Sequence, residues 1–205
     1  KNQFKNNISL NKESIFFINT YGSIYSINKK NMRIKWFINL NQSLELNASN
    51  LFSGTEIVNY GNKLVISSNE FLYIIDTNSG LILHKKKIIL NLKPIISNNY
   101  SFLVSKNNLL ITIDLRTGKI LYSYNINQQI AEFLDIEKKR VEYKNIYLIN
   151  DSIYIFLKNS YILKFNVEGK IKKIINLDEK IKTNPIFVNG SIIYFNQNNN
   201  LIILD

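Results

Sequence analysis

Side chains that could perform catalysis are few in this chain, and their spacing does not gather them into a catalytic set. His84 is the only histidine and the chain has no cysteine, which excludes a His-rich metal site, Cys-ligated zinc and a Ser/His/Asp triad. Asp135, Glu137 and Glu142 are close in sequence, but three cations interrupt them. Because a glycosidase needs two carboxyl groups across a cleft, solvated charge pairing is the better interpretation. We expect no catalytic residue, metal ligand or cofactor.

The elements that would position these side chains belong to a repeated hairpin. Its clearest copy is LLITIDLRTGKILYSYNI, at 109–126. An apolar strand is followed by an Asp that opens a turn, a Gly that closes it, and a second strand in which apolar and polar residues alternate. Asp accepts hydrogen bonds from N–H groups just ahead of it, and Gly can take the positive φ that ends a tight turn. Two short strands joined in this way form a hairpin.

The hairpin recurs with substitutions. FLYIIDTNSGLILHKK has His in the aromatic position, SIYSINKKNMRIKW has Met32 in the Gly position, and YILKFNVEGKIKKI has a turn that is one residue shorter. The residues that define the repeat are Asn28, Trp36, Asp76, Gly80, His84, Asp114, Gly118, Tyr122, Asn166 and Gly169.

The turn-opening residues, called anchors below, set the period of the repeat. They lie 48, 38, 52 and 39 residues apart, at Asn28, Asp76, Asp114, Asn166 and Asp205. Repeats of roughly 40 to 50 residues with several strands each are typical of a β-propeller. The fold class that we predict is therefore all-β, a β-propeller of four-stranded antiparallel blades.

Turn residues divide four of the repeats into four strands each and the fifth into three. In the second repeat, for example, we expect strands at 56–60, 63–68, 71–75 and 81–90. We expect one domain, residues 1–205, forming four to five blades of a larger, seven- or eight-bladed propeller, because open blade edges would expose unpaired backbone. An alternative is that the N-terminal segment supplies the final strand.

One segment departs from the strand pattern, QQIAEFLDIEKKRVEY at 128–143. Its apolar residues, Val141 among them, fall near one helical face with charges opposite, which predicts an inserted loop or a short amphipathic helix. Binding residues concentrate on loops carried by a rigid scaffold. Candidate partner-binding residues are therefore Ile130, Phe133, Leu134, Lys138, Lys139 and Arg140. The alternative is a packed connector that only covers one end of the propeller. The polar loop at 41–53 is a second candidate contact surface.

The net charge of +11 has two interpretations. It could attract nucleic acid, anionic lipid or an acidic partner. The basic residues are scattered, however, and no stretch interleaves them with stacking aromatics as in single-strand binders, which favours a Lys-rich solvated surface. We expect no nucleic-acid partner. No apolar run approaches the roughly 18 residues of a membrane span, and KNQFKNN does not have the pattern of a signal peptide.

The second and third repeats carry the spacing Asp-x-x-x-Gly-x-x-x-His/Tyr. This resembles the repeat of the PQQ-like (quinoprotein-type) β-propellers, in which Asp-x-x-x-Gly-x-x-x-Trp ends each blade. Asn28 and Trp36 fit the same frame, and Pro94 and Pro185 match the family's proline before the first strand of a blade. The resemblance implies that the last, aromatic position packs between adjacent blades.

Two functional branches share this repeat. The small, irregular repeats are more similar to the outer-membrane assembly lipoproteins, which implies a non-catalytic scaffold for protein–protein interactions in outer-membrane β-barrel assembly. The expected place is the periplasm, the expected partners are proteins of the barrel-insertion machinery, and peripheral membrane association would use an N-terminal anchor outside this sequence. No small-molecule substrate is expected. One alternative is a fragment of a PQQ-dependent dehydrogenase, although the vicinal disulfide of that branch is impossible here. The other is a cytosolic interaction propeller.

Overall fold

The computed structural model describes residues 8–40, 57–68 and 70–204. The predicted fold class is confirmed, because the strands of this part of the chain form five antiparallel sheets in which neighbours in sequence are neighbours in the sheet. We call these sheets blades 1 to 5. The fold divides into two compact units, 1–123 and 124–205, with the boundary inside the last strand of blade 3.

The first unit holds blades 1 to 3. Blade 1 consists of β1 (Ile8–Leu10), β2 (Ser14–Ile18), β3 (Ser23–Asn28) and β4 (Ile34–Asn39). Blade 2 consists of β5 (Val58–Tyr60), β6 (Lys63–Ser67), β7 (Leu72–Asp76) and β8 (Ile82–Lys86). Blade 3 consists of β9 (Ile95–Ser97), β10 (Tyr100–Val104), β11 (Leu109–Asp114) and β12 (Ile120–Asn125).

The second unit holds the helix and the last two blades. The helix is α1 (Ile126–Leu134). Blade 4 consists of β13 (Tyr143–Ile149), β14 (Ser152–Leu157), β15 (Tyr161–Asn166) and β16 (Ile171–Asn176). Blade 5 consists of β17 (Ile186–Val188), β18 (Ser191–Phe195) and β19 (Leu201–Leu204).

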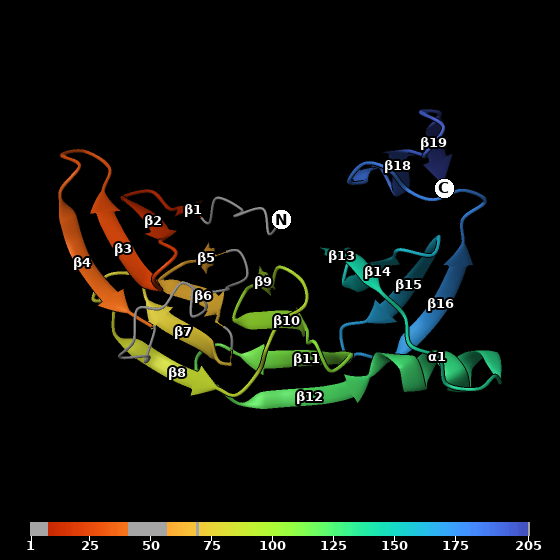
Figure 1. Cartoon of the computed structure of the whole chain (residues 1–205), viewed down its shortest axis with the longest axis horizontal. Coiled ribbons are helices and arrows are strands. Elements are labelled where there is room, and N and C mark those ends of the chain that lie inside the picture. Colours follow the sequence, from red (N-terminus) through yellow and green to blue (C-terminus); the bar gives the residue numbers. More distant parts are fainter. Residues whose placement is uncertain (1–7, 41–56, 69, 205) are drawn as a thin grey trace. The chain divides into compact units, whose positions relative to one another are not determined.

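Within the first unit, the blades stand one behind the other (Figure 1). The first strands of the blades lie along one side, where β5 contacts both β1 and β9, and the last strands lie along the other. The hydroxyl of Ser9 on β1 donates a hydrogen bond to the side-chain oxygen of Asn59 in β5. The first strands of blades 1 and 2, β1 and β5, are therefore joined by a polar contact as well as by packing.

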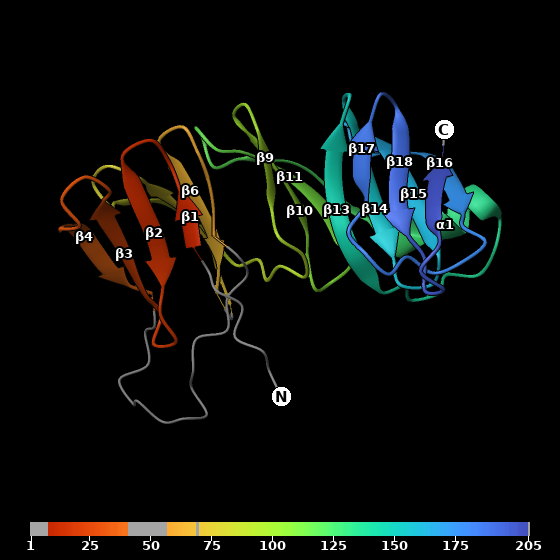
Figure 2. The same cartoon turned by 90° about the horizontal axis from the view of Figure 1, so that it is seen from above.

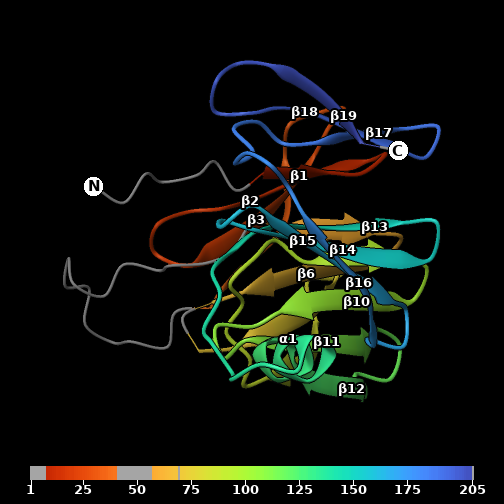
Figure 3. The same cartoon turned by 90° about the vertical axis from the view of Figure 1, so that its right-hand side faces the viewer.

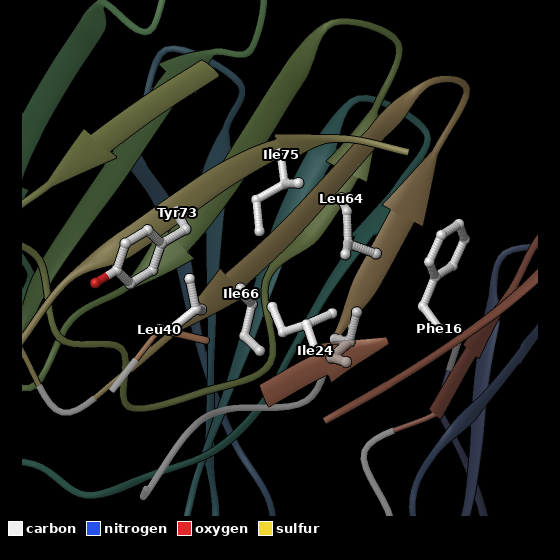
Figure 4. Close-up of a cluster of buried hydrophobic side chains, with 8 residues drawn as sticks. Phe16, Ile24, Leu40, Leu64, Ile66, Tyr73 and Ile75 are labelled. Carbon is white, nitrogen blue, oxygen red and sulfur yellow. The ribbon is translucent and has the colours of Figure 1, made fainter. Parts of the chain in front are cut away.

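The hydrophobic core consists of the faces where consecutive blades meet. Phe16 and Ile24 of blade 1 pack with residues of blade 2 that include Leu64, Tyr73 and Ile75 (Figure 4). Each fully buried side chain of this kind stabilises the fold by about 1.5–3 kcal/mol. A second cluster joins blades 2 and 3, and a third joins blades 4 and 5, which overlap in the view of Figure 2.

The strand at the end of blade 2 is shorter than predicted. We expected a strand over 81–90, but β8 ends at Lys86. The Ile88 N–H donates to the Lys86 carbonyl, which turns the chain out of the sheet. Leu90 then becomes buried in the cluster between blades 2 and 3 and bridges to Ser105 of blade 3. The last part of the segment therefore joins two blades instead of extending one.

Candidate interaction surface

The anchors open turns in which side-chain oxygens accept backbone N–H groups. The Asp114 carboxylate accepts the Arg116 N–H at 2.8 Å, and Asn28 and Asn166 act in the same way on the residues that follow them. Each turn closes at a residue of positive φ, including Met32, with a φ of 55°. The Met32 N–H donates to the Asn28 carbonyl at 2.9 Å. Methionine therefore takes the left-handed conformation that glycine takes in the other turns.

The aromatic residue of one blade contacts the turn of the next. Trp36 of blade 1 lies against Gly80 of blade 2, where a Cβ atom would come within 2.8 Å of the indole ring. The indole Nε1–H donates to the Thr77 carbonyl in that turn at 3.0 Å. His84 of blade 2 lies against Gly118 of blade 3 in the same way.

A hydrogen bond accompanies this second contact. The Nε2 atom of His84 lies 3.1 Å from the Arg116 carbonyl oxygen. A carbonyl only accepts, so Nε2 carries the proton. Tyr122 is half-buried on β12. The ring of blade 1 thus packs on the turn of blade 2, and the ring of blade 2 packs on the turn of blade 3.

The candidate segment begins with a helix that starts earlier and ends earlier than the predicted 128–143. Asn125 caps its N-terminus, because its side-chain oxygen accepts the Gln128 N–H at 3.0 Å. Asp135, with a φ of 52°, ends the helix in a left-handed conformation. The prediction that Val141 shares a helical face with Ile130 was wrong, because residues 136–142 follow the helix as irregular chain.

Gln129 fixes α1 to the edge of blade 4, and sequence reasoning did not identify it. Its Nε2 donates to the Gly169 carbonyl at 2.8 Å, and its Oε1 accepts the Ile171 N–H at 3.0 Å. The amide thus pairs with the backbone at the start of β16 as a neighbouring strand would. Figure 3 shows α1 seen end-on. Beside this contact, the Lys170 ammonium lies 3.9 Å from the centre of the Tyr124 ring, a cation–π geometry.

The far end of the segment is also fixed. The Tyr143 hydroxyl donates to the Asn127 side chain at 3.3 Å, and burial raises the pKa of that phenol. The neighbouring Lys144 donates to the Ile181 carbonyl at 2.6 Å, and burial lowers its pKa. The segment is therefore attached to blade 4 near its start, through Gln129, and enters blade 4 at Tyr143.

The apolar side chains of α1 divide into a packed set and an exposed set. Ile126 and Ala131 are buried and Ile130 is half-buried. Phe133 and Leu134 are 47% and 44% exposed. Ile136, just beyond the helix, is also exposed. Of the candidate partner-binding residues, the structure thus brings Phe133 and Leu134 together at the exposed end of the helix.

The charged part of the segment carries both signs. Lys138, Lys139 and Arg140 are exposed, and four carboxylates accompany them at positions 132, 135, 137 and 142. Glu142 forms an ion pair with Lys158 at 2.8 Å. The hydrogen bond from Lys158 lowers the pKa of Glu142, and the charges of Lys158 and Arg140 add to this effect. The surface is therefore apolar with a mixed-charge border. We call the exposed residues Phe133, Leu134, Ile136, Lys138, Lys139 and Arg140 the α1 surface.

The described residues contain no group of three or more His, Asp or Glu side chains that could hold a metal ion. No helix in the same ranges is long and apolar enough to cross a membrane. A cavity of about 310 Å³ between blades 2 and 3 is lined by Glu70, Lys87, Ile88, Ile89, Ser105, Asn107, Leu109 and Ile111. The polar loop predicted at 41–53 and the anchor Asp205 lie outside the described residues.

Comparison with solved structures identifies the fold. The chain is similar to BamB from Moraxella catarrhalis, with a TM-score of 0.56 and 11% identity over 96% of this chain and 68% of that one. It is also similar to the computationally designed Ika8 protein, with a TM-score of 0.62 and 11% identity over 97% of this chain and 57% of that one. No protein-family model matches the sequence, and no curated protein matches it significantly. At this identity the likeness establishes a β-propeller fold and nothing about activity.

Proposed function

We propose that this chain is a non-catalytic β-propeller scaffold that binds proteins, and that it works in outer-membrane β-barrel assembly on the periplasmic side. Two observations support the proposal. The repeat resembles that of the outer-membrane assembly branch of the PQQ-like propellers, and the fold is similar to that of BamB. The partner that we propose is the barrel-insertion machinery. No cofactor has a part in this function.

The observation that carries the proposal is the way α1 is mounted. Two hydrogen bonds of Gln129 fix the middle of the helix to blade 4, and the contact between Asn127 and Tyr143 fixes the return of the chain. Phe133 and Leu134 nevertheless remain nearly half exposed. Because the helix is held in place, a partner that covers them would not have to order it first, which lowers the entropic cost of binding.

The chemistry of the α1 surface indicates the kind of partner. Apolar side chains at the centre of a contact supply most of the binding energy, and a polar border excludes water and sets orientation. Phe133, Leu134 and Ile136 would form that centre, with Lys138 and Arg140 on the border. We expect a partner that offers an apolar groove or strand with carboxylates beside it.

A binding measurement with purified components tests this function. The unchanged chain and the double variant Phe133→Ser/Leu134→Ser would be titrated against the purified barrel-insertion factor. We expect the double variant to bind at least about tenfold more weakly, because truncating central apolar contacts typically costs 1–2 kcal/mol or more. Leu83→Ser is the matched control, since Leu83 on β8 is also an exposed apolar residue and should leave the affinity unchanged.

Two results would overturn the proposal. Equal affinity of the double variant and the unchanged chain would remove the α1 surface from the contact. Absence of binding to the factor, together with saturable binding of pyrroloquinoline quinone, would instead favour a dehydrogenase fragment.

A further inference from the structure

The last strands of four blades begin with an isoleucine at the same position of the repeat. These isoleucines are Ile34, Ile82, Ile120 and Ile171, in blades 1 to 4. In blades 1, 2 and 4 the isoleucine pairs with the residue just before the anchor. It is 58%, 46% and 46% exposed in blades 1 to 3 but half-buried in blade 4, where α1 contacts β16. The position is thus partly covered by a helix in one blade and open in three.

The backbone at this position has an N–H that points away from the blade. In blade 4, the carbonyl before Ile171 accepts the anchor N–H, and the carbonyl and N–H of one trans peptide unit point in opposite directions. The Ile171 N–H therefore faces outward, where it donates to Gln129 Oε1 at 3.0 Å. In blade 2, the Leu81 carbonyl likewise accepts the Asp76 N–H at 2.9 Å. The Ile82 N–H therefore also faces outward, and it has no acceptor in the described part of the chain.

Blade 2 has this open edge although both of its faces are covered. Blades 1 and 3 pack on the two faces, and β8 lies between β4 and β12 (Figure 1). Leu81, Ile82 and Leu83 are 66%, 46% and 38% exposed. Because neighbouring blades are already in place, this exposure does not come from a missing blade. We call these three residues, with the outward N–H of Ile82, the blade 2 edge.

A β-bulge limits what can bind the blade 2 edge. The pairing of β8 with β7 shifts after Ile82, so Leu83 has no partner of its own on β7. Bulges twist an edge strand and interrupt the regular row of backbone groups that an added strand needs. Blade 4 has the same irregularity beside Ile171, and its edge is occupied by a helix that binds through the side chain of Gln129. The edge geometry therefore favours a helix with an acceptor side chain over an added strand.

The charges beside the blade 2 edge are basic. Lys85, Lys86 and Lys87 follow it in sequence, and the Asp76 carboxylate accepts N–H groups inside its own turn. The Lys85 ammonium lies 4.0 Å from the centre of the Phe71 ring, which leaves the other two lysines for a partner. Cations beside an apolar contact favour a partner with carboxylates. A second copy would instead bring a net charge of +11, so repulsion opposes pairing of two copies.

We propose that the blade 2 edge docks an acidic amphipathic helix of a partner protein, in the way that blade 4 docks α1. The apolar face of the helix covers Leu81 and Ile82. A glutamine or glutamate on that face accepts the Ile82 N–H, and carboxylates beside it face Lys86 and Lys87. The blade 2 edge and the α1 surface are different contacts with different partners, so the inference is independent of the function proposed above.

A fluorescence-anisotropy titration of the full chain with a labelled synthetic peptide tests the proposal. The peptide has about fifteen residues, enough to form a helix in water, with leucines and one glutamine on one face and glutamates on its flanks. We expect saturable binding that Leu81→Ser weakens by at least about fivefold, because a central apolar contact is lost. Phe133→Ser/Leu134→Ser is the matched control: it changes exposed apolar residues of the α1 surface and should leave peptide binding unchanged.

A proline at position 82 tests the backbone donor separately. Proline is tolerated on an edge strand where the N–H it lacks would face solvent. Ile82→Pro should weaken peptide binding several-fold more than Ile82→Val, which has a similar size and keeps the N–H. A peptide with leucine in place of its glutamine removes the acceptor instead, and the unchanged chain should bind it more weakly. This second peptide tests the same hydrogen bond should circular dichroism show that the proline variant is unfolded.

The proposal fails on any of three results. One is the absence of saturable peptide binding to the full chain; binding of phosphatidylglycerol vesicles that Leu81→Ser weakens would then make the edge a lipid-binding surface. The second is peptide binding that neither Leu81→Ser nor Ile82→Pro weakens. The third is equal binding of a peptide whose flanks carry lysine in place of glutamate, which would contradict the proposed acidic partner.

Discussion

Blades 1 to 3 and the α1 segment use different side chains for the same task. In the first unit, Trp36 and His84 each place a ring on a glycine and donate an N–H to a carbonyl of the following turn. In the second unit, the amide of Gln129 donates to the Gly169 carbonyl of such a turn. The repeated turn thus offers a backbone carbonyl each time, at a different position of the turn, while the donor changes from a ring on a strand to an amide on a helix.

The difference has a functional consequence. A ring that covers the next turn is used in the contact between two blades, which leaves little of that side chain free for a partner. Gln129 holds the turn with its own amide. The apolar side chains that follow it in the helix are therefore not needed for that contact. Phe133 and Leu134 remain exposed one helical turn further on. The interruption of the repeat is therefore where the chain can combine a fixed position with an available apolar surface.

The largest effect is expected where a ring meets a glycine. Gly118→Ala adds a Cβ atom 2.6 Å from the His84 ring at a φ of 67°, so overpacking and backbone strain combine. We expect a loss of roughly 2–4 kcal/mol in the free energy of unfolding, measured by urea denaturation. Gly61→Ala is the control, because Gly61 has a similar φ of 56° and nothing within 4 Å. A loss as large at Gly61 would show that the ring contact is unimportant.

A smaller effect is expected for the amide that replaces the ring. Gln129→Leu removes two hydrogen bonds to the edge of blade 4 and should cost about 1–2 kcal/mol. Hydrogen exchange should speed up in α1 more than in β13 to β15, because the helix loses its attachment. Gln128→Leu is the control, since its side chain donates to Glu132 on the exposed side of the helix. Equal exchange in the two variants would contradict the role given to Gln129.

The smallest effect concerns the chemistry of the anchors and depends on pH. The Arg116 N–H lowers the pKa of Asp114, and the guanidinium of Arg116 contributes further. The charged form therefore stabilises the fold above the unfolded pKa of about 3.9, and this stability is lost as pH falls through the lower folded value. Asp114→Asn should flatten the decline of stability in acid, and Asn166→Asp should steepen it. Parallel acid-unfolding curves for all three chains would refute this account.

The elements and turns were predictable because their rules are local. An Asp or Asn followed by a positive-φ residue, between apolar strands, specifies a hairpin within about a dozen residues, and four such turns lie where the spacing placed them. The structure also placed Met32 in the conformation that the pattern assigns to glycine.

The details of the candidate site were not predictable in the same way. Gln129 bonds to Gly169 and Ile171, about 40 residues away, and an isolated Gln carries no signal of such a partner. The helix stops at Asp135 because this residue adopts a left-handed conformation, which its residue type permits but does not require. The apolar period that included Val141 therefore extended the helix too far.

The most direct test of the scaffold account is photo-crosslinking from position 133. A benzophenone amino acid would replace Phe133 in the full chain, and a second chain would carry it at Leu83 on β8. The account predicts a crosslink to the barrel-insertion factor from position 133 and none from position 83. Equal crosslinking from both positions, or none from position 133 while the factor still binds, would contradict the claim that the helix is the contact.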